Sequence, residues 1–320
     1  MQFRTAFKTL AFLFAMLIGP MLFSASRIQD AEARLREASA ERIRAAIQAG
    51  RIDAAIADAR QGVAQFPQSS ELHQLLGAAL FKKGLNAEAR EVFRRAIELD
   101  SEVPQNYYNL ALVELSEKKY PEATRLLEAF LKLDPGNAMA RVMLGRAYHN
   151  QNRTAPAIEQ FKLALELAPQ VPLTHYHLGY AHQSQGNLTA ALAEYEQEIK
   201  LNPGFFEPYH LAGNIQLGRG NLDAAESLFR KGIALRPQGV QALYGLARVL
   251  QERGDLAGAE AALKQVIELN PDHVEAHYAL ARVYQQLGRK SEAAREFKIV
   301  SDFHARDARR SSGIAGGREP

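Results

Sequence analysis

The sequence predicts an all-α fold, a solenoid of stacked helical hairpins, because three series of residues recur at a spacing of 34. One series is alanine at eight successive steps, another is proline at six steps of seven, and the third is mostly glycine. A period of this length is typical of a helix-turn-helix unit whose apolar faces become buried only when neighbouring units stack. We therefore expect about eight repeats over residues 36–305.

The glycine series marks the turn inside each hairpin, because it lies between two stretches with apolar residues at helical spacing. Glycine supplies the left-handed conformation that ends a helix, and asparagine is the usual second choice. Lys118 is neither, so we expect a strained or differently shaped turn in that repeat. The series comprises Gly50, Gly84, Lys118, Asn152, Gly186, Gly220, Gly254 and Gly288. Proline ends each second helix, since it cannot continue the hydrogen-bond ladder.

The alanine series is expected where the two helices of a hairpin approach most closely, because a small side chain permits a short distance between helix axes. It comprises Ala55, Ala89, Ala123, Ala157, Ala191, Ala225, Ala259 and Ala293. On the first helices, a leucine followed by glycine or alanine recurs opposite these alanines. Large residues recur at two further positions of the second helices, and we expect both to pack into one continuous core. The later of these positions holds Leu99, Leu133, Leu167, Leu201, Leu235 and Leu269.

The N-terminal segment, residues 1–26, has the composition of an export signal. Arg4 and Lys8 precede an apolar stretch from Leu10 to Phe23, and small residues follow at Ser24 to Ser26. The stretch has the length of a signal-peptide apolar region and is shorter than a typical membrane span. We expect a protein exported to the periplasm or secreted. The alternative is a protein that an uncleaved segment anchors to the membrane.

The remaining boundaries follow from the repeat. Residues 27–35 are expected to lead into the first helix, and residues 36–305 form the solenoid. Residues 306–320 have no apolar period and predict a disordered tail.

Composition excludes several classes of function. Cysteine is absent, which excludes disulfides, thiolate metal sites and cysteine nucleophiles. The formal charge of +3 falls to +1 without Arg4 and Lys8, so no nucleic-acid partner is predicted. The chain has no phosphate-binding glycine loop, no HExxH and no GxSxG motif. We therefore predict a protein that is not an enzyme and holds no cofactor.

Units such as LGRAYHNQNRTAPAIEQFKLALELAP resemble the tetratricopeptide repeat (TPR) family in their Leu-Gly pair, spaced aromatic residues, second-helix alanine and terminal proline. The resemblance covers residues 36–305. It implies a right-handed superhelix whose concave surface, lined mainly by first helices, holds a peptide or a helix of a partner protein. The general function that it implies is a protein-binding scaffold, which we place in an extracytoplasmic or envelope assembly.

The family's groove positions map onto two columns of first-helix residues in this sequence. Tyr244 with Arg248 and Tyr278 with Arg282 lie four residues apart, which places each cation beside its ring on one helix face. The groove therefore suits an extended peptide or a helix with acidic residues, although tyrosine is also common at this column in generic repeats. The candidate binding residues are Tyr108, Arg146, Tyr176, Tyr180, His210, Asn214, Tyr244, Arg248, Tyr278 and Arg282.

Two other functions remain open from the sequence. His149, His177 and His210 could face the groove together and form a metal- or pH-responsive sensor, but their spacing matches no known ligand pattern, so no metal site is predicted. The last helix could instead stack on another copy and build a self-assembling array. The sequence leaves the oligomeric state open.

Overall fold

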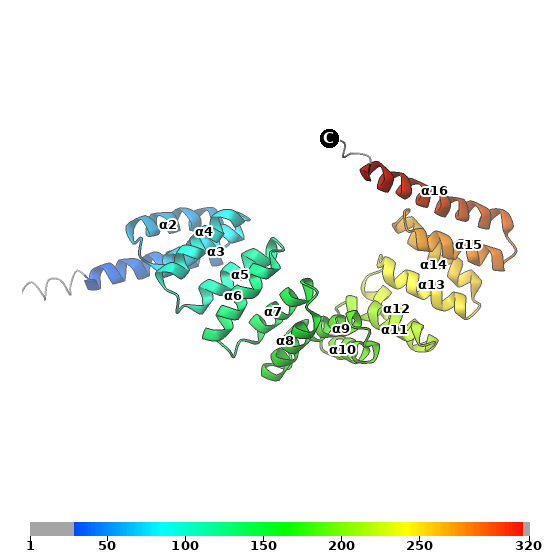
Figure 1. Cartoon of the computed structure of the whole chain (residues 1–320), viewed down its shortest axis with the longest axis horizontal. Coiled ribbons are helices and arrows are strands. Elements are labelled where there is room, and N and C mark those ends of the chain that lie inside the picture. Colours follow the sequence, from blue (N-terminus) through cyan, green and yellow to red (C-terminus); the bar gives the residue numbers. More distant parts are fainter. Residues whose placement is uncertain (1–28, 316–320) are drawn as a thin grey trace, which may run out of the picture. The chain divides into compact units, whose positions relative to one another are not determined.

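The computed structural model describes the backbone of residues 29–315 and side chains up to residue 308. A helix over residues 29–48 is followed by fifteen more, α2 to α16, and the described residues contain no strand (Figure 1). Consecutive helices pack into hairpins, such as α3 with α4 and α15 with α16, which confirms the all-α solenoid.

The chain divides into two compact units, Met1–Arg153 and Thr154–Pro320, which we call unit 1 and unit 2 and describe separately. After the helix over residues 29–48, unit 1 contains α2 (Ile52–Gln65), α3 (Ser70–Lys82), α4 (Asn86–Leu99), α5 (Pro104–Ser116), α6 (Tyr120–Leu133) and α7 (Ala138–Asn150). Unit 2 contains α8 (Thr154–Leu167), α9 (Thr174–Ser184), α10 (Leu188–Leu201), α11 (Glu207–Gly218), α12 (Leu222–Leu235), α13 (Val240–Glu252), α14 (Leu256–Leu269), α15 (Val274–Gln286) and α16 (Lys290–Ala315).

All eight turn residues have the left-handed backbone that the sequence predicts, including Lys118 and Asn152 at φ 59°. The Lys118 turn also closes like the others. The Lys119 N–H donates to the Glu114 carbonyl at 2.8 Å, as the Asp255 N–H donates to the Leu250 carbonyl at 2.9 Å. The expected strain at Lys118 is confirmed by its φ, because a side chain disfavours this conformation. The expectation of a differently shaped turn is wrong.

The alanine series lies in the core, where each member is at most 3% exposed. Opposite it, the small residues of the first helices make room for large rings. A Cβ atom added to Gly213 would lie 2.7 Å from the Phe229 ring, and one added to Gly77 would lie 2.7 Å from Phe93. The recurrent pairing of a leucine with a small neighbour therefore serves close packing between the two helices of a hairpin.

The leucine near the end of each second helix is more exposed than the sequence suggests. Leu167 is 48% exposed and Leu133 is 37% exposed. The reason is their place in the last helical turn, just before the chain leaves for the next repeat, where the following helix covers only part of the side chain. The prediction that this series is buried is wrong for Leu133, Leu167, Leu201, Leu235 and Leu269.

Polar contacts between consecutive repeats recur at the edge where the hairpins turn. Lys83 bonds to Asp53, and Arg253 bonds to Asp223, and the partners in each pair are 30 positions apart in the sequence. The Arg219 guanidinium donates to the Thr189 hydroxyl at 2.6 Å across the same separation. These exposed contacts link consecutive hairpins within each unit.

Both ends of the described chain are more helical than the sequence predicts. The first helix already includes residue 29, so most of the expected lead-in of residues 27–35 is helical. At the other end α16 continues to Ala315, which corrects the predicted disorder for residues 306–315. The run HARDARRSS lacks glycine and proline, and extending an existing helix is far easier than nucleating one.

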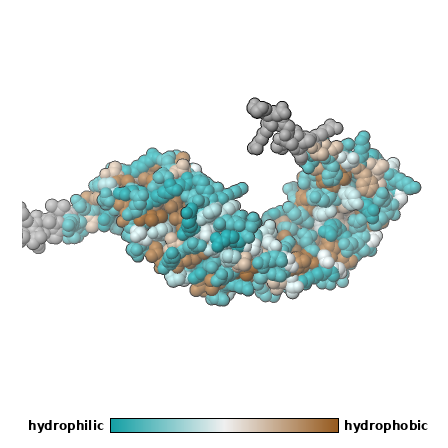
Figure 2. Space-filling view, viewed as in Figure 1, coloured by the Kyte–Doolittle hydropathy of each residue, from teal (hydrophilic) through white to brown (hydrophobic). Residues whose placement is uncertain are grey.

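The predicted export or anchor segment, residues 1–26, lies outside the described residues. None of the helices within the described part of the chain has both the length and the apolarity of a membrane-spanning segment. The face of the molecule shown in Figure 2 is mostly hydrophilic with interspersed apolar patches.

Candidate functional site

The curvature of unit 2 identifies its inner surface. Neighbouring first helices contact each other, α11 with α13 and α13 with α15, whereas consecutive second helices contact each other less. The stack therefore curves toward its first helices, whose exposed side chains lie on the concave side. We call this surface the inner face. It includes eight of the ten candidate residues, namely Tyr176, Tyr180, His210, Asn214, Tyr244, Arg248, Tyr278 and Arg282.

The inner face begins with an aromatic cluster on α9. The Tyr176 ring lies 5.2 Å from the Phe205 ring in an edge-on arrangement and 6.4 Å from the Tyr180 ring. Burial raises the pKa of the Tyr176 phenol, so it stays neutral, and Tyr180 is 44% exposed. Sequence reasoning missed Phe205. The adjacent Phe205 and Phe206 were a usable signal, because no other repeat has two aromatic residues between its terminal proline and its first helix.

A buried carboxylate holds the start of α9. Glu198 is 1% exposed and accepts a hydrogen bond from the Tyr176 N–H at 3.2 Å, and the Asn202 amide also donates to it. Leu173, the residue just before α9, has a left-handed backbone at φ 61°. A capping carboxylate is favourable at a helix N-terminus, where free N–H groups concentrate. Glu198 therefore positions the Tyr176 backbone. Its sequence signal was a glutamate at a repeat position that otherwise holds buried small or apolar residues, namely Ala96, Phe130, Ala164, Gly232 and Val266.

His210 lies on α11, the first helix of the hairpin after α9 and α10, and its ring packs within the inner face. Its ring stacks on Phe206 with 5.3 Å between centroids, and the Arg236 guanidinium lies 4.3 Å from the Phe206 centroid. Burial lowers the pKa of the His210 imidazole, while the nearby Glu207 raises it and Arg236 lowers it. The neutral imidazole is therefore favoured near neutral pH. Asn214 is exposed one turn further along α11.

The two tyrosine and arginine pairs occupy the same register on α13 and α15. The Tyr244 ring lies 5.0 Å from the His273 ring, and Tyr278 packs edge-on against Phe297 at 5.7 Å. Each arginine lies one turn after its tyrosine on the same helix face, but its guanidinium is not stacked over the ring. The expected tyrosine and arginine pairs therefore share a helix face without a cation–π contact. Tyr278 is 50% exposed, and both Arg248 and Arg282 are exposed.

The other two candidates belong to unit 1 and are described within it. Tyr108 on α5 packs against Phe130 at 5.4 Å, and burial raises the pKa of its phenol. Arg146 on α7 is exposed, and its Nη1 lies 3.5 Å from the Met143 Sδ atom. These residues occupy the expected first-helix positions of their own unit.

The histidines do not assemble a metal site within the structure that we describe. The His177 ring stacks on Phe161 at 5.8 Å and lies 5.2 Å from Tyr176, which accounts for it as a packing residue of unit 2. His149 belongs to unit 1, and burial lowers its pKa. No group of three histidine, aspartate or glutamate side chains with metal-binding geometry occurs among residues 29–308.

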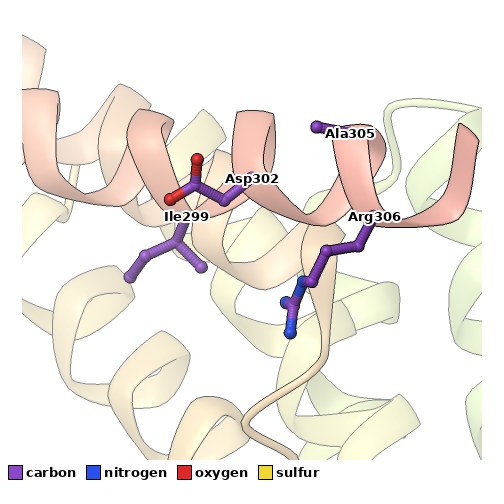
Figure 3. A pocket seen from close by; sticks show the side chains of 4 residues that line it. All are labelled: Ile299, Asp302, Ala305 and Arg306. Carbon is purple, nitrogen blue, oxygen red and sulfur yellow. The ribbon is translucent and has the colours of Figure 1, made fainter. Parts of the chain in front are cut away.

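Hollows also occur on other surfaces of the described chain. Second helices α12 and α14 flank a groove whose floor is formed by Leu243, Leu246 and Leu250 of α13. A smaller pocket on α16 is lined by Ile299 and Ala305 together with Asp302 and Arg306 (Figure 3). Neither hollow groups side chains suited to catalysis.

Comparison with known proteins identifies the repeat unit. Family models described as tetratricopeptide repeat match residues 40–104, 108–172, 174–205, 216–266 and 250–315. No curated protein matches the chain.

Several solved structures are similar in fold. The structure of YrrB, described as a TPR protein with an unusual peptide-binding site, is 25% identical, with a TM-score of 0.52 over 59% of this chain and 98% of that chain. A chain of the APC/C hetero-tetramer Cut9-Hcn1 is 17% identical, with a TM-score of 0.54 over 79% of this chain and 50% of that chain. MamA from Desulfovibrio magneticus RS-1 is 24% identical, with a TM-score of 0.50 over 54% of this chain and 96% of that chain. The last two likenesses concern the fold alone.

Proposed function

The chain belongs to the tetratricopeptide repeat family, and we propose that it is a non-catalytic scaffold that binds a segment of a partner protein on the inner face of unit 2. Repeats of this family bind protein or peptide partners, and their fold is generally non-catalytic. The likeness to YrrB supports a peptide as the bound segment, because that structure is described by its peptide-binding site.

The observation that carries this proposal is the presentation of tyrosine rings along the inner face. Tyr180 and Tyr278 are 44% and 50% exposed, so each presents a large aromatic surface on the inner face. Each ring is held by a neighbour, Tyr180 by Tyr176 and Tyr278 by Phe297. Fixed aromatic rings lose little conformational entropy on binding and bury a large area, which makes them effective binding residues.

Site-specific photocrosslinking in the cell tests the binding face. A photoreactive phenylalanine derivative placed at Tyr180 or Tyr278 of the full chain should crosslink a discrete partner. The matched controls are the same derivative at Lys231 or Lys264, which are exposed on the second helices α12 and α14. Equal crosslinking from both sets of positions, or none from the tyrosines, contradicts the proposal.

We further propose that the scaffold acts outside the cytoplasm, in an envelope assembly. The support is the composition of residues 1–26, with two cations before an apolar stretch of signal-peptide length. A reporter enzyme that is active only after export, fused after residue 60, should be active, and its activity should require residues 1–26. N-terminal sequencing of the mature protein then separates a cleaved signal from an anchor. An inactive fusion that is expressed at normal level contradicts export.

A further inference from the structure

The inner face of unit 2 carries two arginines that no acidic side chain neutralises. Within the described residues, Arg248 and Arg282 form neither an ion pair nor a hydrogen bond. Five other arginines of unit 2 bond to side chains within the fold. Those bonded to a neighbouring side chain are Arg219, Arg230, Arg236, Arg253 and Arg289. The two free guanidinium groups therefore remain available to a ligand.

The surroundings of these arginines favour an anionic ligand. Tyr244 and Tyr278 lie one turn before them on each helix, and burial raises the pKa of the Tyr244 phenol. The same two helices also carry two acidic residues. Glu252 is one turn beyond Arg248, and Glu275 lies two turns before Arg282, where its carboxylate is 3.2 Å from the His273 ring. Neither carboxylate pairs with an arginine, so the arginine row itself stays cationic.

The spacing of the two arginines sets the spacing of the groups that they can bind. They occupy the same register on α13 and α15, which contact each other. Axes of packed helices lie about 8–10 Å apart. A polyproline II segment advances about 3.1 Å per residue with three residues per turn, so side chains three residues apart share a side and lie about 9 Å from each other. In an α-helix the same distance requires a separation of about seven residues, or roughly 10 Å.

We propose that the inner face binds an extended acidic segment of its partner, in which two carboxylates three residues apart contact Arg248 and Arg282. This inference rests on the proposed scaffold function and specifies the chemistry of its ligand. Each guanidinium can bind one carboxylate through two parallel hydrogen bonds. Tyr244 and Tyr278 then pack against the residues between and beside the two acids, which favours a segment with proline or other compact apolar residues at those positions.

Peptide titration of the full chain tests the proposal. The probe is a fluorescein-labelled peptide with two glutamates three positions apart in a proline background, and binding is followed by fluorescence anisotropy at low and high salt. Comparison peptides place the glutamates next to each other or replace them with glutamine. We expect the first peptide to bind about tenfold more tightly than either comparison peptide, and we expect added salt to weaken it.

Protein variants assign the binding to the two arginines. Arg248→Gln and Arg282→Gln should each weaken the glutamate peptide about tenfold, and the double variant should abolish the preference over the glutamine peptide. Arg295→Gln is the matched control, because Arg295 is exposed on the second helix α16 and also lacks an ion pair among the described residues. Circular dichroism of each variant confirms that the helices remain.

The outcomes separate this inference from the scaffold function. Equal binding of all three peptides, or unchanged binding by the double variant, overturns the acidic ligand. If the peptides fail in this way while Tyr180 and Tyr278 still crosslink a partner, the scaffold function stands and only the ligand chemistry is wrong. If the tyrosine positions also capture nothing, both proposals fail. A preference for glutamates seven positions apart in a helical peptide also overturns the extended segment.

Discussion

Arginines are used in opposite ways on a second helix of unit 1 and on two first helices of unit 2. In unit 1, Arg90 is nearly buried and bonds to Glu114 at 2.8 Å and also to Glu117. In unit 2, Arg248 and Arg282 are exposed and have no such partner among the described residues. The first arrangement satisfies a charge inside the fold, and the second leaves charges for a ligand.

The difference depends on which side chains pack against each arginine. Glu114 occupies the helix position at which Tyr148 and Tyr284 pack in other repeats. A carboxylate buried at that position needs a cation, and Arg90 supplies it. No buried acid faces Arg248 or Arg282, so their charge remains exposed. The predictions below test this contrast and the packing on which it depends.

The largest effect is expected from breaking the buried pair of unit 1. Glu114→Ala leaves the Arg90 guanidinium largely buried without its main partner, because the Glu114 side chain is 3% exposed and that of Arg90 is 12% exposed. Removal of one member of a buried ion pair costs about 3 kcal/mol. Urea unfolding of the full chain should show this loss in the transition of unit 1. Arg282→Gln serves as the control and should change stability by less than about 0.5 kcal/mol. A loss below about 1 kcal/mol for Glu114→Ala would show that the pair is not an important part of the fold.

Two glycines of α11 allow a sharp test of packing in unit 2. Gly213→Ala would place a Cβ atom 2.7 Å from the Phe229 ring, whereas a Cβ atom on Gly218 has no neighbour within 4 Å. We expect Gly213→Ala to destabilise the protein by about 2 kcal/mol through overpacking. Gly218→Ala should leave stability unchanged or raise it by up to about 1 kcal/mol, since alanine favours a helix. Thermal and urea unfolding measure both variants, and equal effects would refute the close packing around Gly213.

The fold was predictable because its signals are local and repeated. The turn glycines, the buried alanines and the terminal prolines each have one physical cause, and that cause acts in every repeat. Lys118 follows the same rule against its own preference, because closure of the hairpin determines its backbone. The exposed leucines show the limit of the periodicity, since a repeated apolar position is not necessarily a buried one.

The candidate site was predictable only in part. The register of Tyr244 and Arg248 follows from helical spacing, and the structure places both on the inner face. The contribution of Phe205 depends on a loop that brings its ring to Tyr176, and the role of Glu198 depends on a neighbouring helix start. Whether an arginine is paired depends on contacts between helices 20 to 30 residues apart, as between Arg289 and Glu260, which no local pattern specifies.

The inner face should also make unit 2 sensitive to acid. Burial lowers the pKa of His210 in the folded protein below its unfolded value, so the folded state favours the neutral ring. The contribution of the neutral ring to the free energy of unfolding is present above the unfolded pKa of about 6.5. It is lost as the pH falls below that value, because the unfolded state then binds the proton more readily. When the pH is lowered from 7.5 to 5.5, the midpoint of unfolding should therefore fall less in His210→Phe than in the wild type. His304→Phe, on the exposed part of α16, is the control, and an equal response of both variants contradicts the prediction.

The smallest effect is expected at the Lys118 turn, close to the buried pair of unit 1. Lys118 is exposed and has a left-handed backbone at φ 59°, which glycine adopts without the steric conflict of a Cβ atom. Lys118→Gly should therefore stabilise unit 1 by about 0.5–1 kcal/mol. The adjacent Lys119 has φ −83°, so Lys119→Gly gains nothing from the same freedom and should destabilise by a similar amount. Urea unfolding of the two variants gives opposite signs if backbone strain is specific to Lys118. If both variants lose stability, the Lys118 side chain contributes more to stability than its left-handed backbone costs.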